Sequence, residues 1–359
     1  MIQRAIISGG GTGGHIFPAI SIAEALQRRY SQIDILFIGA EGRMEMQRVP
    51  QAGFRIKGLH IRGLDRKHIW RNVGVLKDFL RALVAARDII REFQPEVVIG
   101  VGGYASAPTL KAAQSLGIPT LIQEQNSYAG VTNKFLARRA DKICVAYPDM
   151  ERFFPKDKIV LTGNPIRPAI EHLKAERREA LEHFGLPLDT ERVVVVVGGS
   201  LGARSINESI GSRLKDWADS GVALIWQTGV AFEEKAKELL AGYHFPVYSS
   251  AFIQRMDLAY TIADVVVSRA GASAISELCL LGKPTILVPS PNVAEDHQTK
   301  NALALSTRSA AILIPDKEAR EELTPRAIAL VKDATQCASL SEEIRKLALT
   351  SAADKIVDE

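Results

Sequence analysis

The chain has 359 residues, of which 47% are hydrophobic and 24% charged, a composition typical of an α/β protein with enough apolar side chains for two cores. No apolar run approaches the roughly 20 residues of a membrane span, and the N-terminus enters a strand without a signal-peptide pattern, so we expect a cytoplasmic protein. The three cysteines, Cys144, Cys279 and Cys337, are too scattered for a disulfide framework or a metal cluster, and we expect them to be reduced.

The net charge of +4 is unevenly distributed along the chain. Up to Gly163 there are 23 basic and 14 acidic residues, a net +9, whereas the remainder carries 22 basic and 27 acidic residues, a net −5. The first half is therefore the part expected to face anionic ligands or surfaces.

The first predicted strand, 5–7, ends in the glycine-rich stretch 9–14, which is followed by His15. A periodic apolar segment from Ile20 predicts a helix with Pro18 near its first turn. Glycines let main-chain N–H groups crowd round an anion at a helix N-terminus, so this loop is expected to bind a diphosphate. Its GxGxxG spacing alone leaves open a dinucleotide site or a structural turn. A histidine directly after the loop can accept a proton near neutral pH, which a dinucleotide fold does not need.

A second strand is predicted over 33–38, and Glu41 follows it at about the place where a dinucleotide-binding protein puts its ribose carboxylate. This position keeps a nicotinamide-dependent oxidoreductase open as an alternative, although a solvated loop explains Glu41 at least as well.

The segment 62–93 interleaves basic and apolar residues and allows two interpretations. In the first, a helix packs one apolar stripe on the domain core and leaves a basic face in solvent. That core stripe would comprise Leu76, Leu80, Leu83 and Ile90. In the second, the segment docks on anionic lipid. The residues that enter the lipid would be Ile69, Trp70 and Phe79.

Further short strands are predicted over 97–101 and 120–123, and each ends in a polar or glycine-rich turn. Gly102 and Gly103 repeat the anion-site pattern after the first of these strands, and Asn126 follows the second. Because the carboxyl ends of parallel strands meet at one edge of a sheet, these turns and the first glycine loop are expected to converge. Strands over 142–145 and 159–161 complete the half, and 163–168 is the predicted hinge.

The second half begins with a charged helix, 176–184, and a new buried strand, 193–197. A second glycine loop, 198–205, and a helix from about Ile206 follow. Further strands are predicted over 222–227, at 247 and 252–253, and over 264–268 and 285–289. Two strand–glycine–helix units, one opening each half, predict two Rossmann-like parallel-sheet domains facing across a cleft.

Two polar segments late in the chain are candidate ligand contacts. Glu277 lies early in a helix after the loop from Arg269, where a favourable charge at the helix N-terminus already explains it. The stretch 292–301 suits hydrogen bonds to a polyol. No Asp-x-Asp pair of the sort that holds a sugar nucleotide through a metal is present.

A set of motifs in order across roughly 270 residues resembles one family closely: GGGTGGH with HIFPA, GGYASAP, QEQN, GNPIR, VVGGSLGA and RAGASAISE. The chain is similar to the MurG-type glycosyltransferases, which add N-acetylglucosamine to lipid I on the cytoplasmic membrane face to make lipid II. The resemblance covers nearly the whole chain and implies a GT-B fold. Residues 1–163 would bind the lipid-diphosphate acceptor and face the membrane, 164–340 would bind UDP-N-acetylglucosamine, and 341–359 would return to the first domain.

The resemblance also implies roles for matching residues. His15 would be the general base that deprotonates the acceptor's 4-hydroxyl, with inversion at the sugar's anomeric carbon. The implied acceptor-binding residues are Gly11, Thr12, His15, Gly102, Gly103 and Tyr104. The implied donor-binding residues are Thr12, Gly13, Gly14, Asn126, Arg167, Gly199, Ser200, Ile253, Ala272, Glu277 and Gln298.

Among the implied donor contacts, Gly199 and Ser200 would hold the diphosphate, with added charge from Arg167. The main chain at Ile253 would read uracil, and Glu277 would accept both ribose hydroxyls. Asn126 and Gln298 would bind the sugar. The chain departs from the family pattern at Ala274, where a hydroxyl is common, and at His297, where some members have glutamine.

The resemblance implies no metal and no other cofactor, because main-chain N–H groups and Arg167 would stabilise the departing diphosphate. The implied partners are UDP-N-acetylglucosamine, lipid I and the anionic inner-membrane surface, without nucleic acid. The implied location is peripheral, on the cytoplasmic face of the bacterial cell membrane. Two alternatives stay open: the oxidoreductase, and a non-catalytic nucleotide-sugar-binding membrane-associated protein that would need no His15.

Overall fold

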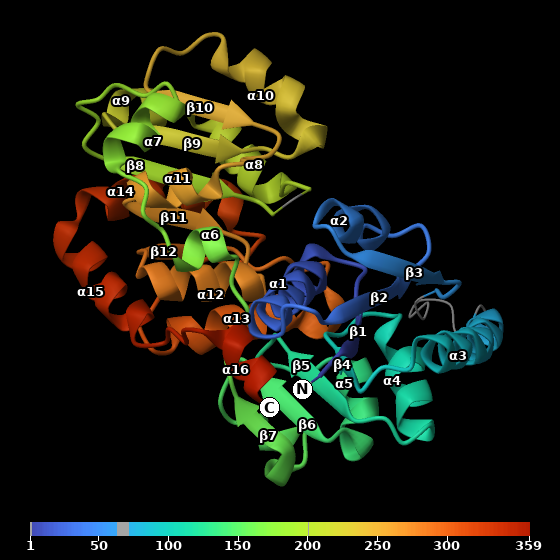
Figure 1. Ribbon diagram of the computed structural model, residues 1–359. Coiled ribbons are helices and arrows are strands. Elements are labelled where there is room, and N and C mark those ends of the chain that lie inside the picture. The colour runs from blue at the N-terminus through green and yellow to red at the C-terminus, as the bar shows by residue number, and fades with distance from the viewer. Residues whose placement is uncertain (1, 63–71, 200) are drawn as a thin grey trace. The chain divides into compact units, whose positions relative to one another are not determined.

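The computed structural model describes residues 2–62, 72–199 and 201–359, which form two compact units. The first unit contains the chain up to Arg167 together with Ser351–Glu359, and the second is Pro168–Thr350. Each is built around one parallel sheet with helices packed on it (Figure 1). This confirms the predicted pair of Rossmann-like domains. The chain leaves the first unit after Arg167 rather than after Gly163.

The sheet of the first unit has seven strands in the order β3-β2-β1-β4-β5-β6-β7, and all neighbouring pairs are parallel. Short runs of buried apolar residues make these strands, as expected for a sheet covered on both faces. Their bounds are β1 Arg4–Ser8, β2 Asp34–Ala40, β3 Arg55–Leu59, β4 Val97–Gly100, β5 Thr120–Glu124, β6 Lys142–Val145 and β7 Ile159–Leu161.

Two apolar cores lie on the two faces of this sheet. Alternating strand residues supply them, so Ile6 packs in the core with helices α3 and α4, and Ile7 packs in the core with helix α1. The helices of the unit are α1 Gly13–Arg29, α2 Glu45–Gln51, α3 Asn72–Phe93, α4 Ser106–Ser115, α5 Val131–Leu136 and α16 Ala352–Asp358, with short 3-10 turns η2 Ala137–Arg139, η3 Met150–Arg152 and η4 Lys156–Lys158.

Helix α16, the last of the chain, packs on α1 of the first unit. Ile356 is buried in the core of that face, and ion pairs join Arg28 to Asp354 and Arg29 to Asp358. The segment that joins the first unit is shorter than expected. Ser341 lies in helix α15 and donates a hydrogen bond to the carbonyl of Gly282, so it belongs to the second unit.

The second unit has a six-stranded parallel sheet in the order β10-β9-β8-β11-β12-β13. The strands are β8 Val193–Val197, β9 Ala223–Gln227, β10 Val247–Ser250, β11 Val265–Ser268, β12 Thr285–Leu287 and β13 Ile312–Leu313. The helices are α6 Pro168–Glu171, α7 Arg177–His183, α8 Arg204–Ser212, α9 Leu214–Ser220, α10 Glu233–Leu240, α11 Met256–Ile262, α12 Ala272–Leu281, α13 His297–Ser306, α14 Ala319–Lys332 and α15 Ala334–Arg345, with 3-10 turns η5 Val230–Phe232 and η6 Ala294–Asp296.

The differences from the expected strands concern sheet edges. The edge strands β3 and β13 were not predicted, because half-exposed residues and short length weaken their apolar pattern. The expected strand at 252–253 is wrong, since those residues form a loop after β10. The loops at the carboxyl ends of the central strands, where ligands are expected, lie where the sequence predicts them.

Candidate functional site

Each sheet has a point where the strand order reverses, between β1 and β4 in the first unit and between β8 and β11 in the second. In open α/β sheets, ligands bind at the carboxyl ends of the strands beside such a point. The glycine loop 9–14 follows β1 and the loop 102–104 follows β4. In the second unit the loop 198–203 follows β8 and 269–271 follows β11. The candidate residues therefore form two sets, one in each unit.

The first glycine loop enters helix α1 earlier than expected. Thr12 is the N-cap in extended conformation and the helix begins at Gly13, so His15 lies in the first turn rather than before the helix. The N–H of Gly11 donates to Oε2 of Glu45 over 2.9 Å. Because that N–H is already bonded to a carboxylate, the first-turn N–H groups of Gly13 and Gly14 are the ones this loop offers to an anion.

The two glycine loops of the first unit pack against each other. A side chain at Gly103 would place its Cβ 2.4 Å from the carbonyl oxygen of Gly10, and a Cβ at Gly102 would lie 3.0 Å from Nε2 of His15. Both glycines have positive φ, +91° and +89°. Only glycine meets these demands, so the structure brings Gly102 and Gly103 directly to the candidate base.

The ring of His15 is oriented by the main chain of its own loop. Nδ1 lies 3.1 Å from the carbonyl oxygen of Gly10, and the hydroxyl of Thr12 is farther away at 3.4 Å. A carbonyl oxygen can only accept, so Nδ1 carries the proton of the neutral ring and Nε2 carries the lone pair. Nε2 is therefore the atom that can act as a base.

Asn126 lies just past the end of β5 and is held by the buried carboxylate of Glu124, the last residue of that strand. Oε1 of Glu124 accepts hydrogen bonds from the main-chain N–H of Asn126 at 3.0 Å and from its side-chain amide at 3.3 Å, while Oε2 accepts from the N–H of Gly130 and from Asn133. Glu124 thus fixes the turn that carries a candidate sugar contact.

Tyr104, a candidate in the loop after β4, is 45% exposed.

Arg167, the remaining candidate of the first unit, is its last residue before the chain crosses to Pro168. It is half-buried and lies between β7 and α6.

In the second unit, the side chain of Gln227 links two candidate donor loops. Its Nε2 donates to the carbonyl of Gly199 over 2.9 Å, and its Oε1 accepts from the N–H of Ile253 over 2.9 Å. The partners fix which end of the amide is oxygen, because a carbonyl must accept and an N–H must donate. The N–H of Ile253 is thereby engaged in a hydrogen bond within the protein. Ser200, beside Gly199, lies outside the described residues.

Glu277 is buried in helix α12, with 5% of its surface exposed. Oε2 of its carboxylate accepts a hydrogen bond from the hydroxyl of Tyr260 on helix α11 at 3.2 Å. Ala272 is the first residue of α12 and is buried. Glu277 lies beyond the first turn of α12, which carries no acidic residue, so a favourable charge at the helix N-terminus does not account for Glu277.

Gln298 lies in the first turn of α13, next to His297. Its Oε1 accepts from the N–H of Ser290 over 2.8 Å, so its amide nitrogen is the group that could donate to a sugar hydroxyl. The same edge of the sheet holds a polar cluster in which Arg269 pairs with Asp316 and donates to the hydroxyl of Ser205. This cluster joins the loop after β11 to the first turn of α8 and to the segment after β13.

The candidate membrane residues divide between described and undescribed positions. Ile69 and Trp70 lie outside the described residues. Phe79 packs partly buried against the core of the first unit, so its predicted insertion into lipid is not supported. The predicted core stripe is wrong for Leu76 and Leu80, which are 63% and 54% exposed.

Helix α3 instead has two apolar stripes. One is buried, and its members are Ala82, Ala86 and Ile90, with Phe79 and Leu83 packed beside them. The other is exposed and comprises Leu76, Leu80 and Val84, spaced four residues apart on one helix face. We call this second set the α3 stripe. No helix within the described ranges has the length and hydropathy to cross a membrane.

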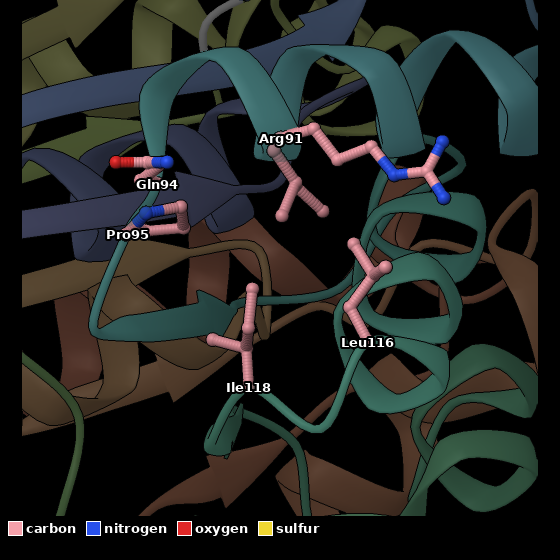
Figure 2. Close-up of a pocket in the computed structure, with 6 residues that line it drawn as sticks. Arg91, Gln94, Pro95, Leu116 and Ile118 are labelled. Carbon is pink, nitrogen blue, oxygen red and sulfur yellow. The ribbon is translucent and has the colours of Figure 1, made fainter.

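A cavity of about 390 Å³ lies at the end of the first sheet opposite the glycine loops, between the C-terminal ends of α3 and α4 (Figure 2). Arg91, Gln94, Pro95, Leu116 and Ile118 line it together with Ile90. Pro95 and Ile118 precede β4 and β5, so the cavity is at the amino ends of these strands. None of the candidate residues lines it.

The described part of the chain holds no group of three or more His, Cys, Asp or Glu side chains placed to bind a metal ion. The cysteines are free thiols, and burial raises the pKa of Cys144 and of Cys279 to about 12. Neither thiol is therefore suited to act as a nucleophile.

Sequence reasoning assigned no role to four supporting residues: Glu45, Glu124, Gln227 and Tyr260. Each acts by holding a candidate residue or loop. The only signal in the sequence was a polar residue at or near the carboxyl end of a strand, which marks Glu124 and Gln227 but not the two on helices.

Comparison with known proteins places these units in a family. Residues 5–145 match the glycosyltransferase family 28 N-terminal domain, and residues 193–356 match the glycosyltransferase family 28 C-terminal domain. The two matches together cover most of the chain; the first spans strands β1 to β6 and the second spans strands β8 to β13.

Two curated relatives are similar over 99% of this chain. A protein of Porphyromonas gingivalis is 64% identical over 94% of its own length, and one of Parabacteroides distasonis is 57% identical over 97% of its length. Both are named UDP-N-acetylglucosamine–N-acetylmuramyl-(pentapeptide) pyrophosphoryl-undecaprenol N-acetylglucosamine transferase. The crystal structure of Acinetobacter baumannii MurG matches with a TM-score of 0.78 and 28% identity, covering 99% of this chain and 98% of that one.

Proposed function

This chain belongs to glycosyltransferase family 28, and we propose that it transfers N-acetylglucosamine from UDP-N-acetylglucosamine to lipid I, forming lipid II. The observation that carries this function is the identity of 57–64% with transferases of that name over 99% of the chain. The GT-B fold of the Acinetobacter neighbour agrees with it. The enzyme is thus a hexosyltransferase of peptidoglycan synthesis.

The oxidoreductase alternative is wrong. It required a single dinucleotide loop and a second domain of another kind, whereas both units carry a parallel sheet with a glycine loop after a central strand. The residue offered as its ribose carboxylate, Glu41, is exposed and pairs with His60.

His15 is proposed as the general base. With its proton on Nδ1, the ring would take the proton of the acceptor's 4-hydroxyl at Nε2 while that oxygen attacks the anomeric carbon and UDP leaves from the opposite side. Attack opposite the leaving group inverts the anomeric centre. Thr12 and the glycine turn Gly102–Gly103 beside the ring would hold the acceptor diphosphate.

The donor would be held by the second unit. Gly199 and the following turn, with Ser200, would bind the diphosphate, and Glu277 would accept the ribose hydroxyls on the carboxylate that Tyr260 orients. The carbonyl of Ile253 would accept from the N3–H of uracil. Gln298 would donate to the sugar, and Ala272 would lie against the nucleotide.

Three further contacts of the donor would come from the first unit. Asn126 would bind the sugar, Arg167 would add positive charge at the diphosphate, and the Thr12–Gly14 turn would approach from the acceptor side. Charge on the departing UDP would then be stabilised by N–H groups and a guanidinium. We propose that this arrangement needs no metal, because the chain has no Asp-x-Asp pair to hold one at a sugar nucleotide.

The enzyme is proposed to act as a peripheral protein on the cytoplasmic face of the cell membrane, where lipid I is anchored. The α3 stripe supports this location. Exposed basic residues flank it, namely Lys77, Arg81 and Arg87, and the first half of the chain carries the net positive charge. Basic residues near an anionic surface each contribute about 1 kcal/mol, and apolar insertion adds to that attraction.

The test is turnover of UDP-N-acetylglucosamine with a lipid I analogue, measured with and without a metal chelator. Formation of the disaccharide lipid at an unchanged rate in chelator is expected. If no product forms either with or without chelator, the transferase function is contradicted. If product forms without chelator but not in its presence, only the metal-free mechanism is contradicted.

A further inference from the structure

A buried carboxylate lies directly beneath the first glycine loop. Glu45, at the start of helix α2, is 1% exposed. Its Oε2 accepts from the N–H of Gly11 at 2.9 Å and its Oε1 accepts from the N–H of Ala40 at 3.0 Å. The two oxygens therefore join the loop after β1 to the end of the neighbouring strand β2.

Two glycines make room for this side chain. A Cβ at Gly10 would lie 2.1 Å from Oε1 of Glu45, and a Cβ at Gly39 would lie 2.6 Å from its Cγ. Contacts this short are not tolerated, so neither position could carry another residue while Glu45 stays in place. Close packing on Glu45 thus restrains Gly10, and the hydrogen bond to its carboxylate holds Gly11.

The loop held in this way is the one that orients His15. The carbonyl of Gly10 lies 3.1 Å from Nδ1, and it is the group that keeps the proton on that nitrogen. A neutral imidazole in water prefers the other tautomer, with the proton on Nε2. The base therefore depends on a main-chain carbonyl whose position follows from the carboxylate of Glu45.

We propose that Glu45 is a positioning residue for His15: it fixes Gly10 and Gly11 so that the Gly10 carbonyl selects the histidine tautomer with its lone pair on Nε2. The catalytic part of this role rests on the proposed function. In many enzymes a carboxylate accepts directly from the base. Here the carboxylate of Glu45 acts on His15 indirectly, through the main chain of Gly10 and Gly11.

The test combines histidine tautomers with kinetics. The chain has 7 histidines, so ring-¹⁵N-histidine NMR spectra of wild type and His15→Gln assign the His15 signals. Wild type is expected to show a protonated Nδ1 in the neutral ring. In Glu45→Gln, one oxygen becomes an NH₂ that faces an N–H donor, so the loop should relax and the population with a protonated Nε2 should rise.

The same variant should lower kcat by roughly 10–10²-fold with little change in the KM for UDP-N-acetylglucosamine, because the base is misplaced while the donor site is intact. Glu41→Gln is the matched control, since Glu41 is an exposed acid of the preceding turn, and it should leave both readouts at wild-type values. Gly39→Ala displaces the Glu45 side chain without changing its charge or the loop sequence, and it should reproduce the effect if Glu45→Gln does not fold.

A wild-type His15 with its proton on Nε2 would overturn the proposal. So would a folded Glu45→Gln or Gly39→Ala that keeps both the wild-type tautomer and the wild-type kcat. The tautomer measurement does not require turnover. A wild type that fails to use lipid I would therefore refute the proposed function, and the NMR spectra would still test whether Glu45 positions His15.

Discussion

The hydroxyl of Tyr260 donates to the carboxylate of Glu277 over 3.2 Å, from helix α11 to helix α12. Both side chains are buried, so Tyr260 constrains the orientation in which Glu277 meets a ribose. Tyr260→Phe should weaken UDP binding by about 0.5–1.5 kcal/mol, the value of one hydrogen bond, and Glu277→Ala by about 1–3 kcal/mol because a charged partner is lost.

Calorimetric titration with UDP measures both variants. Tyr243→Phe is the matched control, because Tyr243 is an exposed tyrosine of the same unit and should bind UDP normally. An unchanged UDP affinity in folded Glu277→Ala would remove Glu277 from the donor site.

The second prediction concerns Gln227, whose amide joins Gly199 to Ile253. Gln227→Glu has the same shape but sets a carboxylate oxygen against the carbonyl of Gly199, so the two donor loops should separate. UDP affinity should fall by about 1–3 kcal/mol, the cost of breaking a buried polar contact.

The added negative charge near a diphosphate must be separated from this effect. Gln254→Glu places the same charge on an exposed neighbour of Ile253. A similar loss of affinity in both variants would show that long-range repulsion, and not the link through Gln227, is responsible.

Residues that support the site divide into those that sequence predicts and those that it does not. Glycine loops after apolar runs were predictable, because positive φ and close main-chain approach leave glycine as the permitted residue at Gly102 and Gly103. The parallel order of the central strands followed from the same runs. These features depend on local sequence, and the structure confirms them.

Glu45 and Tyr260 could not be predicted in this way. Glu41 and Glu45 lie in one polar stretch, yet Glu41 is exposed and Glu45 is buried under the loop. The difference arises because Gly10, which is distant in sequence, and Gly39 of β2 leave space for the side chain of Glu45 under the loop. Likewise, the spacing of Leu76 and Leu80 fits a stripe that packs in the core. The packing of α3 on α4 buries another face of α3, and the two leucines are exposed.

The third prediction concerns His15. If Nε2 is the base, His15→Ala should reduce kcat by about 10²–10⁴-fold while UDP affinity stays within error of wild type. His60→Ala is the control, because His60 is an exposed histidine of the same unit that pairs with Glu41. Near-normal turnover in His15→Ala would return His15 to a structural role in the first turn of α1.

The last prediction concerns the membrane and the α3 stripe. Leu80→Glu should abolish flotation with anionic vesicles, because it puts a negative charge among apolar and basic side chains that face the lipid. The thermal melting curve should not change, since Leu80 is 54% exposed and contributes little to the core. Leu188→Glu is a close control: Leu188 is 55% exposed but lies in the second unit, and its variant should float like wild type.

Salt gives an independent measurement of the same contact. Raising ionic strength screens the attraction between Lys77, Arg81 or Arg87 and the lipid headgroups, so wild type should dissociate from anionic vesicles at high salt and fail to bind neutral ones. If Leu80→Glu floats as well as wild type at low salt, the α3 stripe is not the membrane contact. If wild type floats equally at all salt concentrations, apolar insertion without the basic residues accounts for docking.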